Sequence, residues 1–378
     1  MSSKIDCRPT STSNGRFIET CLRRRAGSSS ARDDLSDDAV DWIETARLAN
    51  EQMVVPALQT ACATSGLCTR LPPDVARYLA FVHRENALVN ERIRRQCLAI
   101  GVVLAQAKIE AVLLKGAAWL FVDGPSRADR MLRDIDLLVE PTLLCRASQA
   151  LIDAGYYTST TIVAEANHIH ALPLVEDSEP ASVELHVEIA TRPALLPSAE
   201  IIAASKPVAI GLRLPSIRHR LVHNVIHAQM TNGDYVGGVV SLRDLLDLKR
   251  LMEDTSASLD WASIVEEAAR RGYLRQLSGA VHKASHYTGA SMPSVLANER
   301  YGRRHLKRCQ IQRISPKLDR QLQKFGVLHR ALLWERDSYA LGLGEDRSLP
   351  AWRKVNARRL SRIRRAIMCR IRKARAVE

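Results

Sequence analysis

The chain has 378 residues, 46% of them apolar, which suffices for two modest domains or for one catalytic domain with helical additions. Its eight cysteines are scattered without a CxxC pair, which argues against a disulfide framework and against a zinc site built on cysteine. The N-terminal residues lack the apolar core of a signal peptide, and no run approaches the roughly 18 apolar residues of a membrane span. We therefore expect a cytoplasmic protein without a transmembrane segment.

The formal net charge of +14 is concentrated in the C-terminal part of the chain. Residues 41 to 298 carry 25 basic and 28 acidic groups, whereas residues 299 to 330 carry 10 and 2, and residues 353 to 378 carry 11 and 1. The body of the chain is thus mildly acidic. The net charge is therefore no indication that an active site within residues 41 to 298 binds a polyanion.

The first part of the chain is predicted to be a tail followed by helices. Residues 1 to 35 are rich in Ser, Thr and Arg, a composition that predicts disorder. The clearest helix is NALVNERIRRQCLAIGVVLAQ at 86–106, where apolar residues recur at steps of three and four. This stripe consists of Val89, Ile93, Cys97, Ile100 and Leu104. One apolar stripe of this kind predicts a helix that lies on a sheet.

Strand candidates follow. AVLLKGAAWL at 111–120 is an apolar run of strand length that reaches Lys115-Gly116, and RDIDLLVE at 133–140 is a second short strand. After a helical stretch near 142–154, HIHALPLV and VELHVEI are further candidates, and the second alternates apolar and polar residues with a two-residue period.

From about residue 199 onward the pattern predicts helices, including LRDLLDLKRLM, where Ser241 and Asp244 form a capping box. The predicted organisation is a tail (1–35), a catalytic domain with N-terminal helices (36–198), a helical domain (199–340), a linker (341–352) and a basic amphipathic helix (353–378).

Two carboxylates in the strand at 133–140 are the first chemical signal. Asp134 and Asp136 alternate with apolar residues, so they point to one face, about 7 Å apart. Like charges at this distance repel unless a cation lies between them, and magnesium is the oxygen-seeking ion that suits them. The alternative is a strand that simply exposes one face to water.

Neighbouring residues supply the other parts that phosphoryl and nucleotidyl transfer require. Gly116 at a strand-to-helix turn allows backbone N–H groups to approach a phosphate, and Lys115 adds a positive charge. Glu184 in the later strand could complete the shell of a second metal ion and promote deprotonation of an acceptor hydroxyl. Lys115 could also be a lysine extending from a strand end, and Gly116 a simple tight turn.

The run LLKGAAWLFVDGPSRADRMLRDIDLLVE resembles the LKG…R…DxDLLV signature of a family of uncharacterised nucleotidyltransferases in the DNA polymerase β-like superfamily. The resemblance extends from about residue 50 to 255. It implies an α+β fold with a small mixed sheet flanked by helices, and a helical C-terminal region. The wider superfamily has Gly-Ser where this chain has Lys-Gly, so the contact from serine to phosphate is missing.

The resemblance also implies roles for single residues. The metal ligands and catalytic carboxylates would be Asp134, Asp136 and Glu184. Lys115-Gly116 would lie on the triphosphate side, and Arg130 matches the arginine of the signature.

Other residues leave alternatives open. Glu188 shares a strand face with Glu184 and is its rival, while His186 could orient a carboxylate, bind substrate or be a structural partner. Of Arg127, Arg130 and Arg133, we expect one to grip phosphate. His223 and His227 have metal-ligand spacing but lack the glutamate of HExxH, so packing is expected for them, as for His168 and His170.

The leading interpretation is a nucleotidyltransferase dependent on Mg²⁺ or Mn²⁺ that moves NMP from an NTP, ATP being one candidate, to a hydroxyl-type acceptor. A small molecule, peptide or protein acceptor is favoured by the mildly acidic body. The alternatives are an RNA-modifying transferase that binds RNA through residues 353–378, which could equally contact an acidic partner, and a nucleotide-binding module without catalytic activity.

Overall fold

The computed structural model describes residues 13–23, 40–122, 126–158, 173–190, 192–254 and 258–314, all within one compact unit, Met1–Pro316. The predicted linker and basic helix, at 341–352 and 353–378, lie outside the described residues. None of the helices in the described ranges combines the length and the apolar character needed to cross a membrane.

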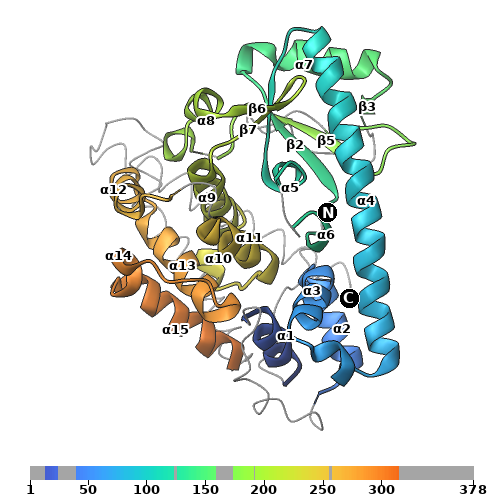
Figure 1. Ribbon diagram of the computed structural model, residues 1–378. Helices are drawn as coiled ribbons and strands as arrows, with labels where there is room; N and C mark the ends of the chain where they lie inside the picture. Colours follow the sequence, from blue (N-terminus) through green and yellow to red (C-terminus); the bar gives the residue numbers. More distant parts are fainter. Residues whose placement is uncertain are drawn as a thin grey trace, which may run out of the picture. The chain divides into compact units, whose positions relative to one another are not determined.

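The described strands form one mixed sheet with the order β3-β4-β5-β2-β1-β7-β6. The strands are β1 (Ala111–Leu113), β2 (Asp134–Leu138), β3 (Tyr157–Thr158), β4 (Leu174–Val175), β5 (Ser182–His186), β6 (Lys206–Ala209) and β7 (Leu212–Leu214). β2 pairs with β5 and β1 with β7 in parallel, while the other neighbours are antiparallel. The expected small mixed sheet flanked by helices is confirmed (Figure 1).

Helices make up most of the rest of the described chain. They are α1 (Ser13–Arg23), α2 (Trp42–Glu51), α3 (Val55–Thr64), α4 (Pro73–Gln106), α5 (Lys115–Trp119), α6 (Ser126–Asp129), α7 (Leu144–Asp153), α8 (Ser198–Ala204), α9 (Ile217–Ile226), α10 (Asp234–Gly237), α11 (Leu242–Glu253), α12 (Trp261–Arg271), α13 (Leu274–Thr288), α14 (Ser294–Ala297) and α15 (Arg300–Ile314). Short 3₁₀ turns lie at Leu67–Arg70, Pro141–Leu143 and Pro193–Leu195, and a π-helical turn at His227–Thr231 continues α9.

The long helix α4 runs from the sheet to α2 and α3 (Figure 1). The predicted stripe is buried from Ile93 to Leu104, but Val89 is 38% exposed. Asn86 and Asn90 take its place, because their side-chain amides donate to the carbonyl oxygens of Ala128, Arg127 and Arg130. At Asn86 and Asn90 the buried face of α4 is therefore polar and holds the segment that precedes β2.

The helical prediction beyond residue 199 is wrong at β6 and β7, which add two strands to the sheet from outside the expected catalytic domain. The two strands are short, and β6 is largely exposed, so the apolar pattern is too weak to show a strand. Gly211 turns the chain between them with φ +68, and a Cβ there would collide with the carbonyl oxygen of Gly101 in α4. This close approach seats the hairpin against α4.

The predicted disorder of residues 1 to 35 is wrong for α1. Phe17, Ile18, Cys21 and Leu22 are buried in the same core cluster as α13. These residues form one apolar helix face, which the polar average composition of the tail concealed. In α11, by contrast, the expected cap is present, since Ser241 Oγ accepts a hydrogen bond from the N–H of Asp244.

Candidate active site

The pairing of β2 with β5 sets the geometry of the predicted carboxylates. The two strands are parallel, with Asp136 opposite Glu184 and Leu138 opposite His186. Because alternate residues of a strand share a face, Asp134, Asp136, Glu184 and His186 belong to one face of the sheet. Residues 48 positions apart in the chain thus form one polar patch.

Asp136 is the most buried member of this patch, with 0% of its surface exposed. Its Oδ1 lies 2.7 Å from Lys115 Nζ and 2.7 Å from His186 Nε2. Burial would raise the pKa of Asp136, but the hydrogen bond with His186 and the charge of Lys115 outweigh it and lower the pKa. The carboxyl group is therefore ionised, while its buried Oδ2 has no hydrogen-bond partner among the described residues.

Lys115 begins α5 directly after β1, with a left-handed backbone (φ 42) that is uncommon outside glycine. Burial lowers the pKa of its ammonium group, but Asp136 more than compensates and raises it. The lysine is thus charged and paired with Asp136. This contact accounts for its position, and its expected contact with phosphate stays a prediction.

Glu184 and His186 complete a compact group with Asp136. His186 Nε2 lies 3.6 Å from Glu184 Oε2, and one ligand atom from each of the three residues lies within 4.8 Å of the others. Two carboxylates and an imidazole suit a divalent cation, and the unpartnered Oδ2 of Asp136 is the atom that such an ion would satisfy. These residues therefore fit a metal ion.

The expected pair of Asp134 and Asp136 is only partly reproduced in this group. Asp134 is half-buried, and burial together with repulsion from Asp136 raises its pKa. His186, not Asp134, is the third member of the compact group, and Glu188 is not part of it. The sequence left the role of His186 open, because an imidazole beside acidic residues gives no sign of its partner.

A cavity of about 270 Å³ adjoins the patch. Its wall includes Lys115, Gly116, Arg130, Arg133 and Asp134 from the sheet side, His219, Arg220, His223 and His227 from α9 and the turn that continues it, and Arg243, Asp244 and Asp247 from α11. Basic side chains outnumber acidic ones in this wall. The predicted site residues thus meet helices whose contribution to the site the sequence did not reveal.

Arg130 lies in this wall with only 8% of its surface exposed. Its Nε donates to Asp247 Oδ2 at 2.8 Å, and a Cβ on Gly116 would collide with its Nη1. Of the three arginines considered for phosphate, Arg130 is thus held by α11. Arg127 donates a hydrogen bond to the carbonyl oxygen of Val122, and Arg133 is exposed. A contact of Arg130 with phosphate stays a prediction.

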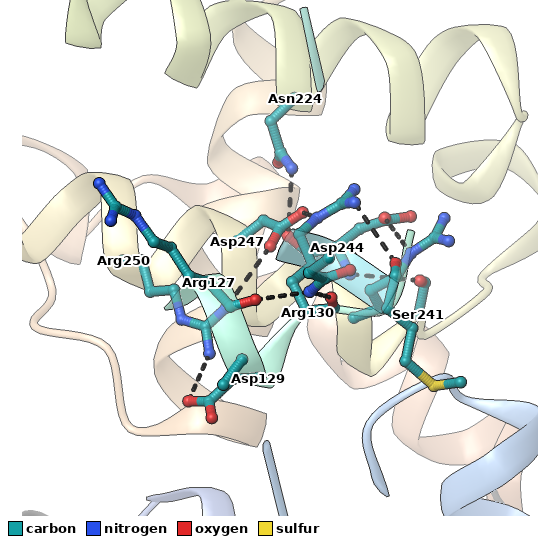
Figure 2. Close-up of polar contacts among 12 residues, drawn as sticks. Arg127, Asp129, Arg130, Asn224, Ser241, Asp244, Asp247 and Arg250 are labelled. Carbon is teal, nitrogen blue, oxygen red and sulfur yellow. Dashed lines mark hydrogen bonds and ion pairs between the residues drawn. The ribbon is translucent and has the colours of Figure 1, made fainter. Parts of the chain in front are cut away.

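A polar cluster around Arg130 joins α6, α9 and α11 (Figure 2). Arg250 Nη2 in α11 donates to Asp129 Oδ2 at 3.1 Å, and Asp129 Oδ1 accepts from Thr60 in α3 at 2.6 Å. Asn224 in α9 donates to the carbonyl oxygen of Asp244. The only sequence signal for this cluster is that Asp247 falls among the buried leucines of α11.

His223 and His227 also face the cavity, with ring centroids 6.1 Å apart. Burial lowers the pKa of both imidazoles, that of His227 to about 4, so both are neutral. They are not members of a metal-binding group in the described part of the chain. His168 and His170 lie outside the described residues.

The model of a family described as "Uncharacterised nucleotidyltransferase" matches residues 38–289, about two thirds of the chain. The chain belongs to this family. It is therefore a nucleotidyltransferase, which agrees with a mixed sheet that carries carboxylates on one face and with the resemblance noted in the sequence. No curated protein and no solved structure matches the chain.

Proposed function

We propose that the protein is a Mg²⁺-dependent enzyme that transfers NMP from an NTP to a hydroxyl-type acceptor and releases pyrophosphate. The observation that carries the proposal is Asp136, a buried and ionised carboxylate with one unpartnered oxygen beside Glu184. A buried charge of this kind is costly unless a cation satisfies it, and Lys115 satisfies only Oδ1.

In this proposal Asp136 and Glu184 hold the metal ion, and Asp134 contributes from the same strand. The metal ion, when bound, neutralises charge on the phosphate oxygens. His186 keeps Asp136 oriented through its 2.7 Å contact, and Lys115 balances the negative charge of the patch. Mn²⁺ is the alternative ion, because carboxylate ligands suit it as well.

The transfer itself is a substitution at the α-phosphorus. The acceptor hydroxyl oxygen forms a bond to phosphorus, the bond from phosphorus to the pyrophosphate oxygen breaks, and the hydroxyl proton passes to a carboxylate. Glu184 is the candidate for this base, because it lies opposite Asp136 on the same face of the sheet and is ionised at neutral pH.

Binding and turnover test the proposal together. We expect calorimetry to show Mg²⁺-dependent binding of at least one of the four NTPs to the wild type, with pyrophosphate release once an acceptor is supplied. Asp134→Asn/Asp136→Asn should lose both, while Asp153→Asn, at the exposed end of α7, should behave as the wild type. Equal binding by the wild type and the double variant would contradict the proposal. Binding without pyrophosphate release would favour the inactive nucleotide-binding module.

The acceptor is proposed to be a small molecule, peptide or protein, because residues 41 to 298 are mildly acidic. The RNA-modifying alternative makes a separate prediction. If residues 353–378 bind RNA, affinity should fall steeply with salt, and deletion of these residues should abolish the RNA binding. Salt-independent or absent RNA binding would leave the non-nucleic-acid acceptor.

A further inference from the structure

Arg220 in α9 has no role in the chemistry described above. It lines the cavity, and its guanidinium carbon lies 4.2 Å from the ring centroid of Trp119 in α5. This stacking fixes the plane of the guanidinium group. Its Nη2 is buried and has no hydrogen-bond partner among the described residues.

His223 lies three positions further along α9, and residues at this spacing share a helix face. Only 5% of its surface is exposed, and its Nε2 is also without a hydrogen-bond partner within the described ranges. The imidazole is neutral and can still donate one N–H group. Two buried polar groups on one helix face thus line the same cavity with unused hydrogen-bonding capacity.

The charges around the cavity favour an anion beside Arg220. Burial lowers the pKa of Arg220 to about 10, so it stays positive at neutral pH. The charges of Asp254 and Asp247 act on it, but not enough to offset its burial. Asp247 is bound by Arg130 at 2.8 Å, and Asp244 in the same wall is paired with Arg243 at 3.3 Å. A buried cation with an unsatisfied N–H group is costly, and an anionic ligand would remove this cost.

We propose that Arg220 and His223 form the subsite that binds the terminal phosphates of the NTP, the part released as pyrophosphate. This inference rests on the proposed function. The same cavity contains Lys115, Gly116 and Asp134, so a nucleotide whose α-phosphate lies at the carboxylates can extend its remaining phosphates towards α9. Arginine suits this role because its N–H groups match phosphate oxygens in pairs.

The first experiment measures binding of inorganic tripolyphosphate, which carries the phosphate chain without a nucleoside, to the metal-free protein by calorimetry. We expect binding by the wild type and a loss of at least about 10-fold in affinity for Arg220→Gln and for His223→Gln. Arg218→Gln is the matched control, because Arg218 is on the same helix but pairs with Glu267 and Ser263 outside the cavity. Arg220→Lys keeps the charge and should retain part of the affinity.

The second experiment separates the subsite from the chemistry. With Mg²⁺ and each of the four NTPs, Arg220→Gln should lose affinity for the triphosphate but bind the corresponding monophosphate as the wild type does. Asp136→Asn should lose the Mg²⁺-dependent binding yet keep binding tripolyphosphate. Unchanged tripolyphosphate affinity in both Arg220→Gln and His223→Gln, or no binding by the wild type, would overturn the subsite. Intact binding without pyrophosphate release would overturn only the transferase function.

Discussion

At the scale of single residues, Asp136 and Lys115 form the pair on which the patch depends. Lys115 Nζ and His186 Nε2 both contact Oδ1 of this fully buried carboxylate, so removal of the lysine leaves a buried negative charge with one partner fewer. Such a loss costs roughly 3 kcal/mol of stability, which a bound cation could restore.

We therefore predict that Lys115→Met lowers the stability of the metal-free protein by roughly 3 kcal/mol. Saturating Mg²⁺ should raise the melting temperature of this variant more than that of the wild type. Thermal unfolding with and without Mg²⁺ measures both effects, and Lys206→Met, at an exposed position in β6, is the control. Equal Mg²⁺ shifts in variant and wild type would show that the ion does not replace the lysine.

Gly116 permits a close approach of side chains. A Cβ there would collide with Arg130 Nη1 and come within 2.9 Å of Leu132 Cδ2. We expect Gly116→Ala to displace Arg130 and to lower stability by about 1 to 3 kcal/mol, as overpacking does. Urea unfolding checks this value. A variant as stable as the wild type would mean that Arg130 moves aside freely and that Gly116 serves only the turn.

At the scale of elements, the ion pair of Arg130 with Asp247 joins the segment before β2 to α11. The two residues are 117 positions apart, and both are buried. Asn86 and Asn90 of α4 hold the same segment through the carbonyl oxygen of Arg130. The loop that carries Arg130 is thus attached to two helices, which fixes one wall of the cavity.

We predict that Asp247→Asn lowers stability by roughly 3 kcal/mol, because it leaves a buried arginine unpaired. Arg130→Met/Asp247→Leu should recover much of this loss, since apolar side chains can replace a buried ion pair. The exposed pair of Arg47 with Glu44 offers a comparison, where Arg47→Gln should change stability far less, because water solvates both charges. Additive losses in the double variant, measured by urea unfolding, would contradict a direct coupling.

At the scale of the whole molecule, the buried histidines make stability depend on pH. Burial and the nearby Lys115 lower the pKa of His227 from its ordinary 6.5 to about 4 in the folded state. Between these values the unfolded chain binds more protons than the folded one. Stability should therefore fall as pH falls from 6.5 to 4, and this contribution should level off at lower pH.

Accordingly, the free energy of unfolding should fall less between pH 7 and pH 5 in His227→Gln than in the wild type. The difference should be up to about 2 kcal/mol. Urea unfolding at the two pH values gives the difference. If the dependence of unfolding free energy on pH is the same in His227→Gln and in the wild type, the pKa of His227 does not differ between the folded and unfolded states.

Much of the fold follows from local patterns in the sequence. The stripe from Ile93 to Leu104 and the cap at Ser241 depend on neighbours within one or two turns, so the sequence reveals them. Strands β6 and β7 escaped prediction because such short strands are defined by the strands they pair with. Asn86 and Asn90 escaped it because a buried amide is not distinguished from an exposed one by residue type.

The sequence by itself determined the carboxylate pattern, because the two-residue period of a strand places Asp134 and Asp136 on one face wherever the strand lies. It also carried the resemblance to a nucleotidyltransferase family, and the match over residues 38–289 shows that family. Only the tertiary structure decided the partners: His186 and Lys115 on Asp136, Asp247 on Arg130, and Trp119 beneath Arg220. The reason is that such contacts join distant segments, and their energies depend on burial that no local pattern specifies.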